Sequence, residues 1–213
     1  MFDQRPGPSL PHLMLIALAV GGLALLLWRT NAEPLAVSRW GGAGGVFSAP
    51  PVAAIRGEAA AGGLEAAPNG DAERPYGNPL GDPRTVLTQG YGVGSHAPAA
   101  IWGGLDLAID GTGDGMPEPG PTQDAPIYAT HNGVARVRPD TWPAGNYLAI
   151  ENDRYKTAFA HLSRYAVANG EAVTRGQIIG YVGSTGQSSG PHLHYEVWED
   201  GSNRNPQDFG APQ

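Results

Sequence analysis

The stretch GSTGQSSGPHLHYEV, residues 183–197, decides the fold, because it ends in an alternation of polar and apolar residues. In a β-strand, residues two apart project from the same face of the sheet. His192 and His194 therefore share one face, and the apolar residues around them face the other way. The pattern predicts a half-buried strand. Two imidazoles on one face can serve a metal ion or a reacting group, or they can simply face solvent.

The sequence around this stretch, residues 81–213, consists of short β-rich runs between turn signals such as Asn132-Gly133 and Asn169-Gly170. No long amphipathic helical pattern interrupts them. We therefore expect an all-β domain of antiparallel strands, packed as a sandwich or an open barrel. The expected strands are Pro126–Thr130, Val134–Val137, Tyr147–Glu151, Tyr155–Leu162, Gln177–Val182 and Leu193–Trp198.

Composition excludes several classes of function. The 213 residues include no cysteine, which excludes disulfides, iron–sulfur clusters, cysteine zinc sites and cysteine nucleophiles. The net charge of −7 argues against a nucleic-acid partner, because phosphate binding needs a basic surface. Chemistry in this chain must come from His, Asp, Glu or Ser, or from a metal ion that these residues hold.

The N-terminal part of the chain predicts a location. After a tail at residues 1–12, residues 13–28 form the apolar run LMLIALAVGGLALLLW. As a helix, this run would be about 24 Å long, slightly short for a bilayer core of about 30 Å. It is slightly long for a signal peptide, so a membrane anchor and a cleaved signal both stay open. Residues 29–80 are rich in Ala, Gly and Pro and predict a flexible linker. Either alternative makes the protein membrane-anchored or secreted, with the β domain outside the cytoplasmic membrane.

The stretch at 183–197 closely resembles the signature of the lysostaphin/LytM-type zinc endopeptidases, which have the duplicated-hybrid-motif fold. Further segments resemble that family in the same order along the chain. They are Gly90–Gly92, Gly104–Ala108, Ala125–Val134, Phe159–Leu162, Gly176–Gly180 and Asn205–Pro206. The resemblance implies an endopeptidase with one Zn²⁺ ion that hydrolyses peptide bonds in peptidoglycan.

The resemblance also implies a role for individual residues. Asp106 and His194 fall on metal-ligand positions of the family, and a water molecule takes the open position of such a site. His161 and His192 fall on the two histidines that act on the water and the oxyanion. Glu196 either orients a histidine as a second-shell residue or is an exposed carboxylate of the strand.

One family ligand is missing, because the position four residues before Asp106 holds Trp102, and indole does not bind zinc. One explanation is that His96, from the loop at residues 94–99, supplies the missing imidazole. The alternative is a degenerate, non-catalytic domain that binds the cell wall or activates an amidase, or an interaction subunit of a membrane complex. An amidase or envelope-complex partner belongs to that alternative, whereas the enzyme takes a peptidoglycan peptide.

Two further features have simpler interpretations. His131 precedes Asn132-Gly133, and we expect it to face solvent at a turn. Residues 110–118 contain spaced carboxylates that suit either a calcium loop or a solvated acidic insertion, although the EF-hand spacing is absent.

Overall fold

The computed structural model of the protein describes residues 64–213. The expected tail, the apolar run at residues 13–28 and most of the expected linker lie outside the described residues. Within residues 64–213, no helix has both the length and the apolar character that crossing a membrane requires.

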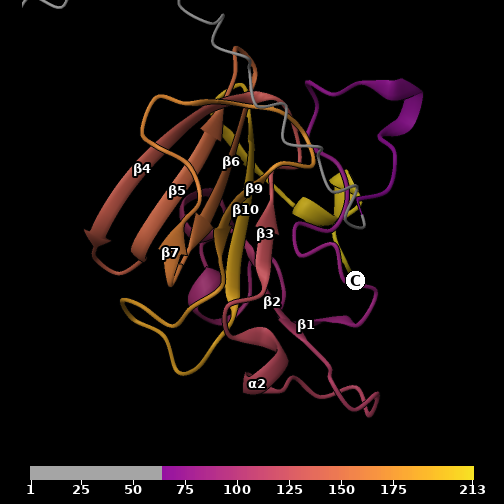
Figure 1. Ribbon diagram of the computed structural model, residues 1–213, viewed down its shortest axis with the longest axis vertical. Helices are drawn as coiled ribbons and strands as arrows, with labels where there is room; N and C mark the ends of the chain where they lie inside the picture. Colours follow the sequence, from indigo (N-terminus) through magenta and orange to yellow (C-terminus); the bar gives the residue numbers. More distant parts are fainter. Residues whose placement is uncertain (1–63) are drawn as a thin grey trace, which may run out of the picture. The chain divides into compact units, whose positions relative to one another are not determined.

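The described residues form strands joined by turns and a few one-turn helices (Figure 1). The helical turns are η1 (Pro68–Gly70), η2 (Gly94–His96), α1 (Ala99–Trp102), α2 (Pro119–Thr122) and η3 (Pro206–Phe209). The strands are β1 (Thr85–Gln89), β2 (Leu105–Ile109), β3 (Pro126–Tyr128), β4 (Gly133–Thr141), β5 (Gly145–Glu151), β6 (Tyr155–Ala160), β7 (Arg164–Tyr165), β8 (Ala172–Val173), β9 (Ile178–Tyr181), β10 (Leu193–Glu199) and β11 (Ser202–Arg204).

The strands form two sheets in which every pairing is antiparallel. The larger sheet has eight strands in the order β1-β2-β10-β6-β5-β4-β8, with β11 paired to β10. The smaller sheet has the order β3-β9-β7. Figure 1 shows β4, β5, β6 and β10 side by side in the larger sheet. The all-β, antiparallel expectation is confirmed.

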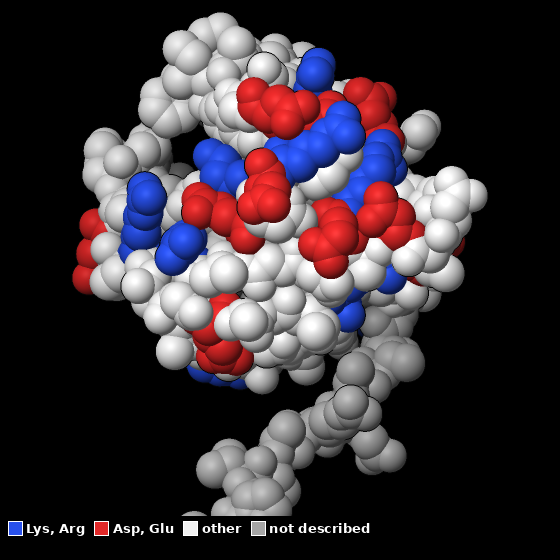
Figure 2. Space-filling view, turned by 90° about the horizontal axis from the view of Figure 1, so that it is seen from above, with Lys and Arg blue, Asp and Glu red and all other residues white. Residues whose placement is uncertain are grey.

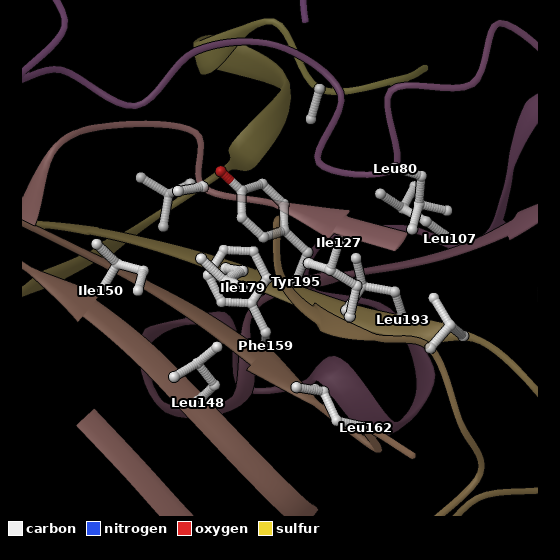
Figure 3. Close-up of a cluster of buried hydrophobic side chains, with 14 of the residues drawn as sticks. Leu80, Leu107, Ile127, Leu148, Ile150, Phe159, Leu162, Ile179, Leu193 and Tyr195 are labelled. Carbon is white, nitrogen blue, oxygen red and sulfur yellow. The ribbon is translucent and has the colours of Figure 1, made fainter. Parts of the chain in front are cut away.

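The hydrophobic core contains side chains from both sheets (Figure 3). Phe159 of β6 and Tyr195 of β10 are fully buried, with ring centroids 5.4 Å apart. Ile127 of β3 and Ile179 of β9 join the same cluster from the smaller sheet. Because alternate residues of β10 enter this core, the remaining residues of that strand are presented on the opposite face.

The strands predicted from sequence agree with the observed ones to within a few residues. The largest difference is β4, which continues past Val137 to Thr141. The pattern did not predict β1, β2, β7, β8 and β11, because a strand of two to five residues has few alternations by which it can be recognised.

The segment from residue 64 to residue 80 packs on the domain, although its composition suggested part of a linker. Leu80 is buried in the core. The Tyr76 N–H donates to the Thr130 carbonyl at 3.2 Å, and the Gly77 N–H donates to the Phe209 carbonyl at 2.8 Å. These are backbone contacts, which hydrophobic periodicity does not reveal.

His131 is fully buried, so the expectation of a solvent-facing turn residue was wrong. Its Nδ1 lies 2.8 Å from the Asn132 carbonyl and its Nε2 lies 3.1 Å from Thr157 Oγ1. The turn that follows His131 packs against the segment before residue 80, where the Asn132 N–H donates to the Ala72 carbonyl. A long-range contact thus covers a residue that local turn propensity would expose.

Burial lowers the pKa of His131 from 6.5 to about 4, which predicts a pH-dependent stability. Between these two values the unfolded chain binds a proton that the folded state excludes, so acidification favours unfolding. We expect His131 to reduce the free energy of unfolding by on the order of 2 kcal/mol as the pH falls from about 6.5 to about 4. Urea denaturation at a series of pH values measures this.

The matched control for this prediction is His131→Gln, because an amide keeps hydrogen-bonding capacity and does not titrate. The variant is expected to lose less stability than the wild type over the same pH interval. Equal losses in the two proteins would show that His131 does not cause the acid sensitivity.

Charged side chains on the face shown in Figure 2 are mixed, with Lys and Arg lying among Asp and Glu. Ion pairs among the described residues include Arg154 with Glu199 at 2.7 Å. This face therefore offers no continuous basic surface to a polyanion.

Candidate functional site

Strand β10 carries the centre of the site on its solvent-side face. Leu193, Tyr195 and Val197 are buried in the core, whereas His194 and Glu196 point to the other face, as the alternation predicted. The neighbouring strand β2 pairs with β10 so that Asp106 lies directly opposite His194. Strand pairing thus joins two residues that are 88 positions apart in sequence.

Three potential ligand atoms converge at this point. Asp106 Oδ1 lies 3.1 Å from His96 Nε2 and 3.0 Å from His194 Nδ1, and the two histidine nitrogens are 3.1 Å apart. His96 reaches the site from η2 and is buried. Trp102 is not part of this cluster. It ends α1, is 48% exposed and lines the rim of the cleft in front of the cluster.

The outer contacts of the two imidazoles determine which nitrogen atoms face the cluster as acceptors. His96 Nδ1 donates to the Gly90 carbonyl at 3.0 Å, because a carbonyl oxygen can only accept. His194 Nε2 donates to Glu196 Oε1 at 3.2 Å for the same reason. In the neutral rings, His96 Nε2 and His194 Nδ1 then carry lone pairs directed toward the Asp106 carboxylate. Three acceptor atoms in mutual contact repel one another unless a cation or a proton lies between them.

The donor set and its dimensions fit a zinc ion. Two imidazoles and one carboxylate make the three protein ligands of a catalytic zinc site, which leaves one position open. Ligand atoms about 2.0–2.1 Å from a tetrahedral zinc ion lie about 3.3 Å from one another. The observed separations of 3.0–3.1 Å are close to this value.

The pKa values in the cluster reflect its preference for positive charge. Burial alone would raise the pKa of Asp106, but its contacts with His194 and His96, which are hydrogen bonds when the facing nitrogens carry a proton, outweigh burial and hold this pKa well below its usual range. Burial alone would lower the pKa of His194, but Asp106 and Glu196 raise it to about 9. Burial would raise the pKa of Glu196, but its hydrogen bond from His194 lowers it.

Glu196 contacts His194 and is itself fixed by a second hydrogen bond. Its second oxygen accepts a hydrogen bond from Trp198 Nε1 at 2.6 Å. The carboxylate is only 14% exposed, so it is not the freely solvated strand carboxylate that we considered as an alternative. This contact gives Glu196 the geometry of a residue that orients His194.

His161 and His192 stand beside the cluster, with their ring centroids 4.7 Å apart. His161 Nδ1 donates to the Thr185 carbonyl at 2.8 Å, and His192 Nδ1 donates to the Gly190 carbonyl at 2.8 Å. Each neutral ring therefore keeps Nε2 as an acceptor, and His192 Nε2 lies 3.8 Å from Asp106 Oδ1. Burial lowers the pKa of His161 to about 4, so this ring is neutral near pH 7.

The backbone at two positions is adapted to the site. His161, directly after β6, has a φ of 64°, a left-handed conformation that costs a non-glycine residue on the order of 1 kcal/mol or more. A Cβ atom at Gly104 would lie 2.5 Å from His194 Cε1, so a side chain there would displace the imidazole. The first is backbone strain at a residue beside the cluster, and the second is space that the His194 ring occupies.

A cleft of about 870 Å³ contains all six residues that the sequence proposed for the site. Sequence reasoning missed other side chains that line it, among them Arg138, Trp142 and Tyr147. Strand alternation gives the face of a residue such as Tyr147. Its neighbours across the sheet depend on register, which the local pattern leaves undetermined.

The acidic loop at residues 110–118 is held by its own donors. Asp110 accepts backbone N–H groups of Thr112 and Gly115 at 3.1 and 2.7 Å. Glu118 accepts the Thr112 hydroxyl at 2.8 Å. Asp110, Asp114 and Glu118 lie close enough to be grouped as potential ligands, and the expected choice between a calcium loop and a solvated insertion stays a prediction.

Comparison with known proteins finds one family model that matches part of the chain. Residues 118–206 match the sequence model of Peptidase family M23. The matched range includes His161, His192 and His194, whereas His96 and Asp106 precede it.

Relatives of known name resemble part of the chain. Peptidoglycan DD-endopeptidase ShyB of Vibrio cholerae is 51% identical over 75 residues, covering 34% of this chain and 17% of the relative. Peptidoglycan DD-endopeptidase ShyC of the same organism is 42% identical over 89 residues, covering 41% and 21%. DD-carboxypeptidase/endopeptidase Mpg of Neisseria meningitidis is 40% identical over 91 residues, covering 42% and 21%. The chain thus spans about a fifth of the length of these relatives.

Solved structures also match part of the chain. A zinc containing peptidase from Vibrio cholerae is 32% identical with a TM-score of 0.49, and the match covers 66% of this chain and 41% of that chain. The SpoIIQ-SpoIIIAH pore forming complex is 22% identical with a TM-score of 0.50, and the match covers 66% and 93%. The second likeness concerns the fold alone.

Proposed function

Because residues 118–206 match the sequence model of Peptidase family M23, we propose that the chain is a zinc-dependent endopeptidase that hydrolyses peptide bonds in peptidoglycan. The observation that carries the proposal is the convergence of His96 Nε2, Asp106 Oδ1 and His194 Nδ1 as three acceptors within 3.1 Å of one another. The names of the relatives, which are peptidoglycan DD-endopeptidases, support the substrate.

In this proposal His96, Asp106 and His194 hold the metal ion, and Glu196 orients His194 through Nε2. When bound, zinc supplies the Lewis acidity that makes a water molecule nucleophilic near neutral pH and polarises a carbonyl group. Glu196 fixes both the tautomer and the ring plane of His194, which is the usual role of a carboxylate behind a histidine ligand.

His161 and His192 carry the proton transfers of the proposed reaction. The acceptor Nε2 of His161 takes a proton from the attacking water. Because its pKa is low, the protonated ring readily gives that proton to the leaving amine. His192, whose Nε2 faces the cluster, donates to the oxygen of the scissile carbonyl when that nitrogen carries a proton, as negative charge develops there.

The location of the protein is part of the same proposal. Peptidoglycan lies outside the cytoplasmic membrane, so the domain would act there. The apolar run at residues 13–28 supports this placement, either as a retained anchor or as a cleaved signal.

Two measurements on the purified full chain test the function. Elemental analysis is expected to find one zinc ion per chain. Incubation with purified peptidoglycan is expected to release fragments whose masses identify a hydrolysed peptide bond. Asp106→Ala is the control and is expected to lose both properties. A wild-type chain that binds no zinc and releases no fragment would overturn the proposal and favour a non-catalytic binding or amidase-activating domain.

A further inference from the structure

The register of the large sheet places a row of residues across the face that carries the site. Asp106 on β2 lies opposite His194 on β10, and His194 lies opposite Ala160 on β6. On β5, Leu148 lies opposite Phe159 of β6, so Tyr147 is the next residue of β5 beside Ala160. Tyr147 pairs with Arg138 on β4. Directly opposed residues share a face of the sheet. This row therefore runs from the cluster of Asp106 and His194 to the guanidinium group of Arg138.

Arg138 is the single Lys or Arg among the described residues that line the cleft. Its guanidinium group has no carboxylate within ion-pair distance in the described part of the chain, whereas Arg136 on the same strand pairs with Glu151 at 3.2 Å. The Arg138 side chain is exposed, and its backbone carbonyl accepts a hydrogen bond from Tyr165 Oη at 3.1 Å. The cleft therefore ends in a positive charge that the protein itself leaves unpaired.

The two carboxylates of the cleft do not compete for Arg138. Asp106 contacts His96 and His194, and Glu196 contacts His194 and Trp198. An anionic group that entered the cleft would meet one end occupied by histidine–carboxylate pairs and one end with an unpaired cation.

Exposed tryptophans stand at both ends of the row. Trp102 ends α1, just before β2, and is 48% exposed. Trp142 follows β4 directly and is 78% exposed. Both line the cleft, and such flat apolar side chains can pack against an extended peptide without specifying its sequence.

From this arrangement, we propose that Arg138 forms a subsite for a carboxylate group of the peptide substrate. The inference rests on the proposed function, because it assigns specificity to the same cleft. Arg138 is three strand spacings from His194, about 14 Å at roughly 4.8 Å per strand. An extended peptide advances about 3.3 Å per residue, so the recognised carboxylate lies within about four residues of the scissile bond.

Equilibrium binding of two probes tests the subsite. The probes are a cross-linked peptide purified from peptidoglycan with its carboxylates free, and the same peptide after conversion of its carboxylates into amides. Binding is measured by tryptophan fluorescence with the full chain carrying His161→Ala, so that hydrolysis does not consume the peptide. We expect the carboxylate form to bind about tenfold more tightly, as for one charge-assisted hydrogen-bonded pair.

Arg138→Gln, added to the His161→Ala chain, is expected to bring the ratio of the two affinities close to one. Arg138→Lys is expected to keep part of the preference for the carboxylate form. The matched control is Arg136→Gln, which removes the same charge from the same strand outside the cleft and is expected to leave the ratio unchanged. Equal affinities in the parent protein, or a full preference in Arg138→Gln, would overturn the proposal.

Two further arms separate this inference from the function on which it rests. Amidation of the terminal carboxylate alone and of the side-chain carboxylates alone shows which source Arg138 recognises, because one of them must remove the preference. Hydrolysis by the wild-type chain is measured in parallel. Cleavage without a carboxylate preference refutes the subsite and keeps the peptidase, whereas a preference that depends on Arg138 without cleavage supports the subsite and refutes the peptidase.

Discussion

His96→Ala is expected to lower the zinc affinity of the full chain by more than about 100-fold, whereas Trp102→Ala is expected to change it by less than about threefold. His96 contributes one of three converging atoms, with Nε2 3.1 Å from Asp106 Oδ1. Removal of a residue that only orients a ligand already lowers metal affinity 10- to 100-fold, so removal of a ligand is expected to lower it more. Competition with a chelating dye measures both affinities.

Trp102→Ala is the informative control, because residue 102 occupies the position of the family's histidine in sequence. The Trp102 side chain is half-exposed on the cleft rim and offers no ligand atom. If His96→Ala keeps one zinc ion with wild-type affinity, His96 is not a ligand and another residue must complete the site. If Trp102→Ala loses zinc while the protein stays folded, the rim is needed to hold the η2 turn.

His161→Ala is expected to lower kcat on peptidoglycan peptides by about 10²- to 10⁴-fold, the usual contribution of a general acid–base group. Zinc affinity is expected to stay within about tenfold of the wild type, because His161 directs Nδ1 to the Thr185 carbonyl and is in neither group of potential metal ligands found in residues 64–213. Steady-state kinetics and metal content of the same preparation give the two values.

His131→Gln is the matched control for this experiment, because it alters a buried histidine outside the cleft. It is expected to retain wild-type kcat at pH 7. A His161→Ala variant with kcat within twofold of the wild type would remove His161 from the mechanism. A parallel loss of zinc and activity would instead make it a ligand.

The sequence predicted much of the fold from local patterns. Alternation along residues 193–198 gave both the strand and its two faces, because side-chain direction in a strand depends only on position along the chain. The turn signals gave the division of residues 126–198 into short strands. The motif resemblance gave Asp106, His161, His192 and His194 as site residues, and the structure brings them into one cleft.

Tertiary structure decided what local patterns leave open. His131 sits at a turn by propensity, yet the chain before residue 80 covers it. Nothing in the sequence distinguishes Arg138 from an ordinary exposed arginine. Only the pairing of β4, β5, β6 and β10 aligns it with His194. Register between strands is set by the packing of the whole sheet, which no single strand encodes.

The sequence by itself determined an antiparallel β domain with histidines and a carboxylate on one face of its central strands. It left open whether a second imidazole joins His194 at Asp106 as the third potential ligand, because Trp102 holds the expected position. The structure answers this with His96, which the η2 turn and the Gly90 carbonyl direct into the cluster. The physical reason for the difference is distance along the chain. Strand periodicity depends on adjacent residues, whereas the cluster joins a loop residue and a strand residue 98 positions apart, which only the folded chain brings together.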